Sequence, residues 1–377
     1  MEINKFFPEI RGNFGFGCMR LPMQGEDVDY EEFTKMADAF LDAGFNYFDT
    51  AHGYLQGKSE TAIRDCVAKR YDQSRFLLTN KLTGTFFNRQ EDIRPLFEQQ
   101  LELCGVDYFD FYLMHAQTLN GYEKYNKCKA YETAYALKGE GLIRHFGISF
   151  HDKADVLDRI LTEHPEIEAV QIQFNYADYE DATVESRKVY ETCEKHGKPV
   201  IVMEPVKGGS LVNLPEAADQ ILRGLGGGSN ASYAIRFAAS FPSMAMVLSG
   251  MSNFEQLQDN VNAMRDFKPL DEREMAAIKQ VCDIFRSQNL IPYTACKYCI
   301  EESKCPKGIR IPDLFAALNA HETFHNWNTG FYYNAIVTGN GHGKASECIK
   351  CGKCEKVCPQ HLPIRELLTK VAAAFEH

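Results

Sequence analysis

The sequence predicts a closed (β/α)8 barrel followed by a smaller, mainly helical domain. Eight short segments rich in apolar, β-branched or aromatic residues recur along the chain, and longer amphipathic stretches separate them. Strands that alternate with helices pair in parallel, and eight such units fit a closed barrel. The composition then changes near residue 286, where a cysteine-rich segment begins.

The eight predicted strands occupy residues 15–19, 46–51, 75–82, 109–116, 145–150, 168–175, 199–206 and 245–251. In the stretches 29–43, 59–70, 92–104 and 154–164 the apolar residues recur every three or four positions, which is typical of amphipathic helices. A doubly wound open sheet is the alternative. Against it, FGFGCM does not lead into a GxGxxG helix, and just one helix follows the eighth strand before the composition changes. We therefore predict a barrel over residues 1–285 and a second domain over 286–377.

Bulk composition excludes several classes of function. The chain has 377 residues and a formal net charge of −11, and it contains no basic run that would gather nucleic-acid phosphates. No apolar run approaches the roughly 20 residues of a membrane span, and the first residues do not resemble a secretory signal. Six of the 13 cysteines are widely scattered, as expected for free thiols in a reducing compartment. These features predict a cytoplasmic protein without nucleic-acid or membrane partners.

Four polar residues stand at or just beyond the ends of predicted strands, where barrels gather their active sites. They are Asp49, Tyr54, Lys81 and His115. A lysine beside a tyrosine favours phenolate and lowers the phenol pKa, and an aspartate orients the lysine. A nearby histidine can hold a carbonyl oxygen, so the set suits proton delivery to a carbonyl that receives hydride.

The sequence around these residues resembles the aldo-keto reductase family. The segments FDTAHGY (48–54), TNK (79–81), FYLMH (111–115) and GIS (147–149) match its signatures in order and spacing over roughly residues 10–270. The resemblance implies a barrel that binds a nicotinamide cofactor, and a catalytic tetrad at the four positions named above.

The resemblance also implies a set of cofactor contacts. Ser149 and Gln171 fit the carboxamide contacts, while Lys207, Gly208 and Gly209 would lie along the pyrophosphate. Met203 stands where many members stack a tyrosine on the nicotinamide. Near the adenosine phosphate, the implied residues are Gly250, Ser252, Gln256, Asp259 and Asn260.

The choice between NADH and NADPH stays open. Gly250 and Gln256 replace the basic pair of NADPH-preferring members, so a 2′-phosphate loses its best partners. Ser252 and Asn253 can still hydrogen-bond such a phosphate.

Residues 348–359 read CIKCGKCEKVCP, which is the bacterial ferredoxin spacing. In that arrangement three thiolates hold one cubane and the cysteine before proline reaches a second cluster. Zinc is the alternative metal for these cysteines, but zinc sites generally use two CxxC pairs. An earlier segment, ACKYCIEESKCP (295–306), looks like the partner motif with one cysteine missing.

Crossed ligation would place Cys305, Cys348, Cys351 and Cys354 on one complete [4Fe-4S] cluster. Cys296, Cys299 and Cys358 would hold a second cluster with an incomplete cysteine set, since its fourth position falls on Tyr293 or Glu302, depending on the alignment. The whole chain thus resembles a subgroup of aldo-keto reductases with a C-terminal ferredoxin-like iron-sulfur domain.

The leading functional hypothesis is NAD(P)H-dependent reduction of an aldehyde or ketone, with the clusters serving structure or a separate one-electron redox partner. The alternatives are an electron-transfer protein that uses the barrel as a scaffold and a regulatory sensor of oxidation. Hydride passes directly from nicotinamide to carbonyl, so we expect the clusters to be dispensable for simple reduction. The sequence does not select a carbonyl substrate.

Overall fold

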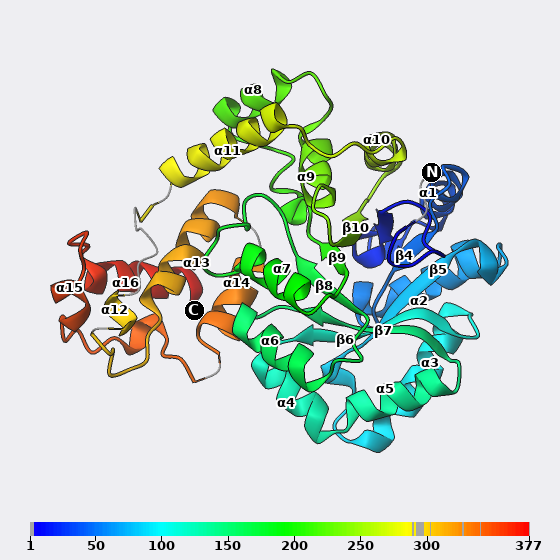
Figure 1. Cartoon of the computed structure of the whole chain (residues 1–377), viewed down its shortest axis with the longest axis horizontal. Coiled ribbons are helices and arrows are strands. Elements are labelled where there is room, and N and C mark those ends of the chain that lie inside the picture. Colours follow the sequence, from blue (N-terminus) through cyan, green and yellow to red (C-terminus); the bar gives the residue numbers. More distant parts are fainter. Residues whose placement is uncertain are drawn as a thin grey trace.

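The computed structural model describes residues 4–288, 290–291, 298–301, 303–325, 328–339 and 341–376. Eight parallel strands form a closed barrel in the order β1-β10-β9-β8-β7-β6-β5-β4, which confirms the predicted fold class (Figure 1). The barrel strands are β1 (Phe14–Gly17), β4 (Tyr47–Asp49), β5 (Leu77–Leu82), β6 (Phe109–Gln117), β7 (Ile143–Phe150), β8 (Ala169–Gln173), β9 (Val200–Met203) and β10 (Met244–Gly250). A short hairpin of β2 (Met23–Gln24) and β3 (Asp27–Val28) stands apart from them.

Helices surround the barrel, and each of them buries part of its surface. They are α1 (Tyr30–Asp42), α2 (Lys58–Ile63), α3 (Ile93–Cys104), α4 (Leu119–Lys127), α5 (Ala130–Gly139), α6 (Ala154–Glu163), α7 (Ser186–Lys195), α8 (Glu216–Arg223), α9 (Asn230–Ala239), α10 (Phe254–Arg265) and α11 (Glu272–Ser287). Helix α2 continues as the π-helical turn Arg64–Ala68, which accounts for the long predicted stretch at 59–70. Helix α11 ends just beyond the predicted domain boundary at residue 285.

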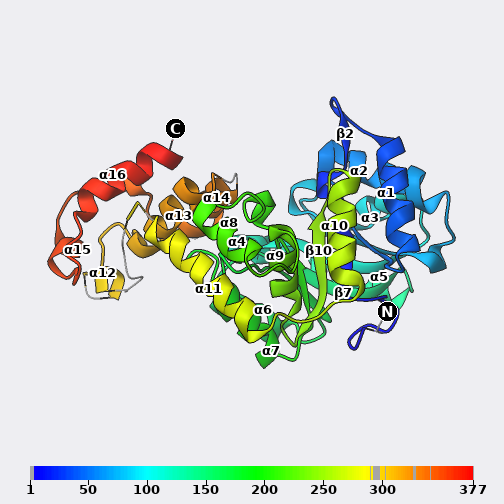
Figure 2. The same cartoon turned by 90° about the horizontal axis from the view of Figure 1, so that it is seen from above.

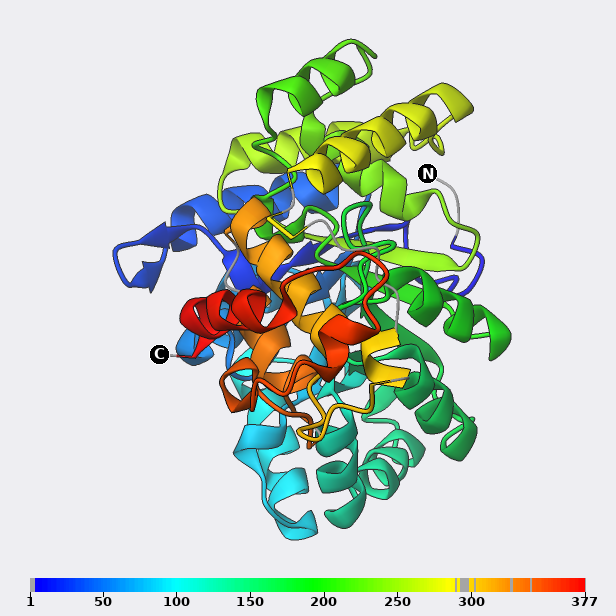
Figure 3. The ribbon, with the colours of Figure 1, turned by 90° about the vertical axis from the view of Figure 1, so that its left-hand side faces the viewer.

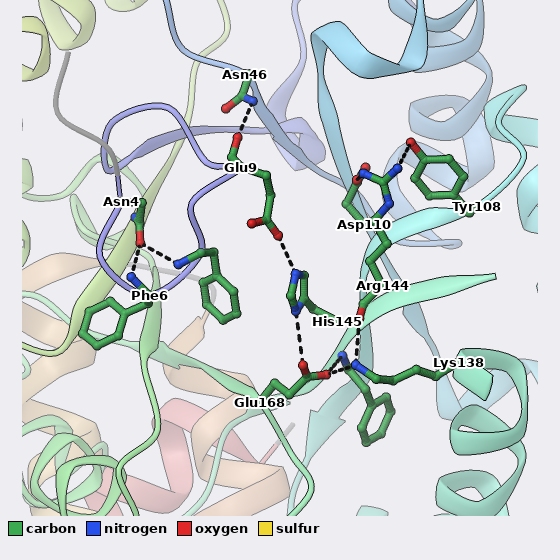
Figure 4. Close-up of polar contacts among 12 residues, drawn as sticks. Asn4, Phe6, Glu9, Asn46, Tyr108, Asp110, Lys138, Arg144, His145 and Glu168 are labelled. Atoms are coloured by element: carbon green, nitrogen blue, oxygen red, sulfur yellow. Dashed lines mark hydrogen bonds and ion pairs between the residues drawn. The ribbon is translucent and has the colours of Figure 1, made fainter. Parts of the chain in front are cut away.

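The N-terminal segment covers the amino ends of the strands. Asn4 donates its amide to the Ala245 carbonyl at 2.5 Å, and the Phe7 ring packs edge-on against Phe111 at 5.0 Å between centroids. Figure 4 shows Glu9 beside His145, whose other nitrogen contacts Glu168 at 3.2 Å. This network closes the end of the barrel opposite the carboxyl ends of the strands.

The cysteine-rich part of the chain folds into a separate group of helices at one side of the barrel (Figures 2 and 3). These helices are α12 (Tyr298–Glu301), α13 (Ile311–Phe324), α14 (Asn328–Phe331), α15 (Lys353–Lys356) and α16 (Ile364–Phe375), and α14 continues as the π-helical turn Tyr332–Val337. Leu314, Leu318 and Val371 form a core with Cys299, Cys354 and Cys358. Across the described ranges, none of the helices combines the length and apolar character that membrane crossing demands.

Candidate active site

A buried ion pair joins two of the four predicted catalytic residues. Lys81 near the end of β5 donates its ammonium to Asp49 Oδ1 at 2.6 Å and to the Thr50 carbonyl at 2.7 Å. Gln171 on β8 donates to the other Asp49 oxygen at 3.0 Å. Burial alone would lower the pKa of Lys81, but Asp49 and Tyr54 raise it above 10.5. The lysine is therefore a fixed positive charge beneath the site.

Tyr54 lies next to this charge. Its hydroxyl is 3.4 Å from the Lys81 ammonium. Burial penalises the phenolate more than Lys81 favours it, so the pKa of Tyr54 is raised above its ordinary value of 10.0. The lowered pKa expected from the sequence is therefore wrong, because the sequence could not weigh burial against the lysine. The phenol stays protonated at neutral pH and remains a proton donor.

His115 completes the group from β6. Its ring lies 5.8 Å from the Tyr54 ring between centroids, and its Nδ1 is 2.7 Å from the Thr83 hydroxyl. Burial, with help from the Lys81 charge, holds the pKa of His115 well below 6.5. The imidazole is therefore neutral, and in the tautomer where Thr83 donates to Nδ1, Nε2 carries a proton that it can donate to a carbonyl oxygen.

A cavity of about 570 Å³ opens over these residues, a volume typical of cofactor and substrate pockets. Asp49, Tyr54 and His115 line it, together with most of the residues predicted to contact the cofactor: Ser149, Gln171, Met203, Gly208, Gly209, Gly250, Ser252, Gln256, Asp259 and Asn260. A second groove of about 740 Å³, between α11 and α13, contains none of these residues. The structure thus brings catalytic and cofactor candidates from the carboxyl ends of six strands, and from the segments that follow them, into one pocket.

Lys207 is the exception among the predicted cofactor contacts. Its side chain is buried, forms an ion pair with Asp178 and lies over the Phe324 ring, with the ammonium 4.9 Å from the ring centre. It is absent from the cavity wall that Gly208 and Gly209 help to form. Its ammonium is therefore directed away from the place where a pyrophosphate was expected to lie.

Sequence reasoning missed several barrel residues that line the cavity, and three of them have ionisable side chains. Arg20 follows β1, and its side chain packs beside Gly250. His151 follows β7 with Nε2 at 3.5 Å from the Ser149 hydroxyl, and burial lowers its pKa to about 4. Glu204 follows β9 with a left-handed backbone (φ 56°), and burial raises the pKa of its carboxyl. The only signal for them in the sequence was their position directly after strands.

Three further cavity residues come from the C-terminal helices: Asn328, Phe331 and Tyr332. The sequence suggested that the aromatic pair was core of the small domain. The pair also contacts the barrel, since the Phe331 ring lies edge-on to His151 at 5.7 Å and the Tyr332 hydroxyl donates to Gln173. No pattern in the sequence could reveal this, because contacts between domains depend on how the two domains dock.

Four cysteines of the C-terminal region line one small pocket. They are Cys305, Cys348, Cys351 and Cys354, the set that crossed ligation assigns to one complete cluster. Cys299 and Cys358 are buried elsewhere in the same core, while Cys296, Tyr293 and Glu302 lie outside the described residues. Among the described residues, no three potential ligands lie close enough for a single metal ion. A cubane takes one thiolate on each of its irons, so four thiols around a common pocket suit it.

The sequence model of the aldo/keto reductase family matches residues 13–283. The chain belongs to this family. As an aldo/keto reductase it carries an additional C-terminal part, and a model described as a 4Fe-4S dicluster domain matches residues 294–362. Both matches confirm the family and the iron-sulfur domain expected from the sequence.

Relatives of this aldo/keto reductase include the uncharacterized oxidoreductase YqkF of Bacillus subtilis, 23% identical over 301 residues that cover 70% of this chain and 90% of the relative. Aldo-keto reductase family 1 member C3 of Homo sapiens is 30% identical over 138 residues, covering 31% of this chain and 41% of the human protein. Both support an oxidoreductase of the aldo/keto reductase type.

Solved structures show the same fold. An aldo-keto reductase from Klebsiella pneumoniae in complex with NADPH superimposes with a TM-score of 0.59 at 19% identity, covering 71% of this chain and 90% of the other. The thermostable aldo-keto reductase Tm1743 gives a TM-score of 0.61 at 22% identity, covering 74% of this chain and 98% of its own. The barrel is therefore the shared part.

Proposed function

We propose that this aldo/keto reductase uses NAD(P)H to reduce a small aldehyde or ketone. The arrangement of Tyr54, the Lys81–Asp49 pair and His115 around one cavity is the observation that supports this proposal most. A bound nicotinamide would supply hydride. Tyr54 would donate the proton, and His115 would hold the carbonyl oxygen.

The cavity walls suit the cofactor along its whole length. Ser149 and Gln171 would hold the carboxamide, and the backbone at Gly208 and Gly209 would face the pyrophosphate. Near the adenosine, Asp259 already accepts a hydrogen bond from Ser229 at 2.5 Å, and Asn260 donates to Ser249 at 2.8 Å. These contacts order the pocket before any ligand arrives.

Among the described residues that line the cavity, Arg20 is the one lysine or arginine. The Gln256 side chain accepts a hydrogen bond from the Ser252 backbone N–H at 2.8 Å through its Oε1 atom. Arg20 packs against Gly250 on the same side of the cavity, and its carbonyl accepts the Ser252 hydroxyl at 2.9 Å. We propose that Arg20 pairs with a phosphate of the cofactor.

The iron-sulfur domain would hold one complete [4Fe-4S] cluster on Cys305, Cys348, Cys351 and Cys354. A second cluster on Cys296, Cys299 and Cys358 would lack a fourth thiolate. Because each cluster moves one electron and nicotinamide moves two as hydride, the clusters would serve structure or a separate one-electron partner.

The test is a panel of carbonyls assayed with NADH and NADPH, aerobically and anaerobically. Wild-type protein should reduce at least one aldehyde or ketone, and Arg20→Gln should weaken NADPH binding more than it weakens the catalytic step. If purified protein with its clusters intact oxidises neither cofactor with any carbonyl but exchanges electrons with a viologen, the scaffold hypothesis takes its place.

A further inference from the structure

One segment of the C-terminal part lies between the barrel and the cysteine-bearing core. This bridging segment, Asn328–Val337, consists of α14 and the π-helical turn that follows it. It contains two neighbouring tyrosines, Tyr332 and Tyr333, which are 6% and 0% exposed. Because both are buried, each must belong to a packed interface.

The two tyrosines belong to different interfaces. Tyr332 packs with Ile336 against Val184 of the barrel domain. Tyr333 belongs to the core that contains Cys299, Cys354 and Cys358, and it stacks on Phe375 at 4.5 Å between ring centroids. The bridging segment therefore has one face on the barrel and the other on the cysteine core.

The barrel-facing side makes polar contacts at the carboxyl ends of two neighbouring strands. The Tyr332 hydroxyl donates to Gln173 Oε1 at the end of β8, and Asn328 Nδ2 donates to Glu204 Oε1 just after β9. Gln173 is also held from the other side, since its amide donates to Asp178 at 2.6 Å. Both contacts fix side chains that form the wall of the cavity lined by Tyr54 and His115.

These contacts lie at the part of the cavity expected to take the nicotinamide. Gln173 is two positions after Gln171, on the same face of β8, and it pairs in register with Met203 on β9. Tyr332, Gln173 and Met203 all line the same cavity. The second Glu204 oxygen is buried without a hydrogen-bond partner in the described part of the chain, and Asn328 donates the hydrogen bond that holds the first oxygen.

We propose that the bridging segment is a wall of the nicotinamide pocket, with Tyr332 and Asn328 as positioning residues that fix Gln173 and Glu204. This inference rests on the proposed function. The reductase site then depends on the docking of the iron-sulfur domain, although the sequence alone suggested that the barrel suffices. Folding of the cysteine core, through Tyr333, supports cofactor binding in the barrel.

The test compares two variants of the whole chain that each lose one buried hydroxyl. Tyr332→Phe removes the bond to Gln173, whereas the control Tyr333→Phe removes the bonds to Glu376 and to the Ala345 backbone N–H, both inside the small domain. Binding of NADPH and of NADH is measured by fluorescence titration of anaerobically purified protein. Visible absorption of the clusters reports that the domain is intact in each variant.

We expect Tyr332→Phe to raise the Kd of the nicotinamide about fivefold, which is the change that the loss of one hydrogen bond typically causes. The variant should raise KM more than it lowers kcat. Tyr333→Phe should leave Kd within about twofold and lower only the melting temperature. Asn328→Ala, which leaves the buried Glu204 carboxyl unanchored, should raise Kd about tenfold or more.

Two results would overturn the inference. If Tyr332→Phe and Asn328→Ala bind nicotinamide as tightly as the wild type while their clusters remain intact, the bridging segment is not part of the pocket and the proposed function stands. If the wild type binds neither nicotinamide, the proposed function fails and the inference fails with it.

Discussion

Removing the Lys81 charge should destabilise the barrel strongly, because the lysine neutralises a buried carboxylate. The Lys81 and Asp49 side chains are 0% and 6% exposed, and their charged atoms are 2.6 Å apart. At an effective dielectric constant of about 20, such a pair attracts by about 6 kcal/mol, most of which offsets the cost of desolvating both groups. Lys81→Met deletes the attraction but leaves Asp49 in place. We expect the free energy of unfolding to fall by about 3 to 5 kcal/mol.

Neutralising the partner should recover much of this loss. In Lys81→Met/Asp49→Asn neither member of this pair carries a charge, and Gln171 still has a side chain to contact. We expect the double variant to be at least about 2 kcal/mol more stable than Lys81→Met alone. Denaturant unfolding of the wild type, both single variants and the double variant, monitored by a signal from the barrel, gives the coupling energy.

Activity should not follow stability in this series. Carbonyl reduction should fall by about 100-fold or more in both Lys81→Met and the double variant, because Tyr54 loses the adjacent cation. The reasoning is refuted if Lys81→Met costs less than about 1 kcal/mol, or if the double variant is no more stable than that single variant.

Three other predictions concern separate parts of the molecule. Tyr54→Phe should lower carbonyl reduction by about 100-fold or more with nicotinamide binding nearly normal, and unchanged turnover in steady-state kinetics would exclude Tyr54 as the acid. Cys351→Ala should remove most of the thiolate-to-iron absorption of the purified protein, and metal analysis that finds zinc without sulfide would contradict the cluster assignment. Burial opposes the imidazolium of His145, yet Glu168 and Glu9 raise the pKa of the ring above 6.5. The charged ring therefore stabilises the folded protein fully below pH 6.5, and this contribution is lost as the pH rises through the raised pKa. His145→Gln should therefore lower Tm at about pH 6 more than at about pH 9, and equal shifts at the two pH values would disprove the linkage.

The sequence was sufficient for the barrel because its strands carry local signals. Each of the eight predicted ranges overlaps an observed strand, and the polar residues at their ends, such as Asp49 and His115, face a common cavity because parallel strands end on the same side. The direction of the Tyr54 pKa shift and the orientation of Lys207 could not be predicted. Both depend on burial and on a partner distant in sequence, such as Asp178.

Residues 328–332 also affect how selectively the pocket could be inhibited. The match to Tm1743 covers 98% of the Tm1743 chain and 74% of the present chain. Tm1743 therefore has little beyond the barrel. Phe331 then offers an aromatic ring at the cavity wall, from a part of the chain that a barrel-only enzyme does not possess. A compound that spans the Tyr54 end of the cavity and rests on Phe331 would discriminate between the two kinds of enzyme, whereas one confined to the Tyr54 and His115 end would bind both.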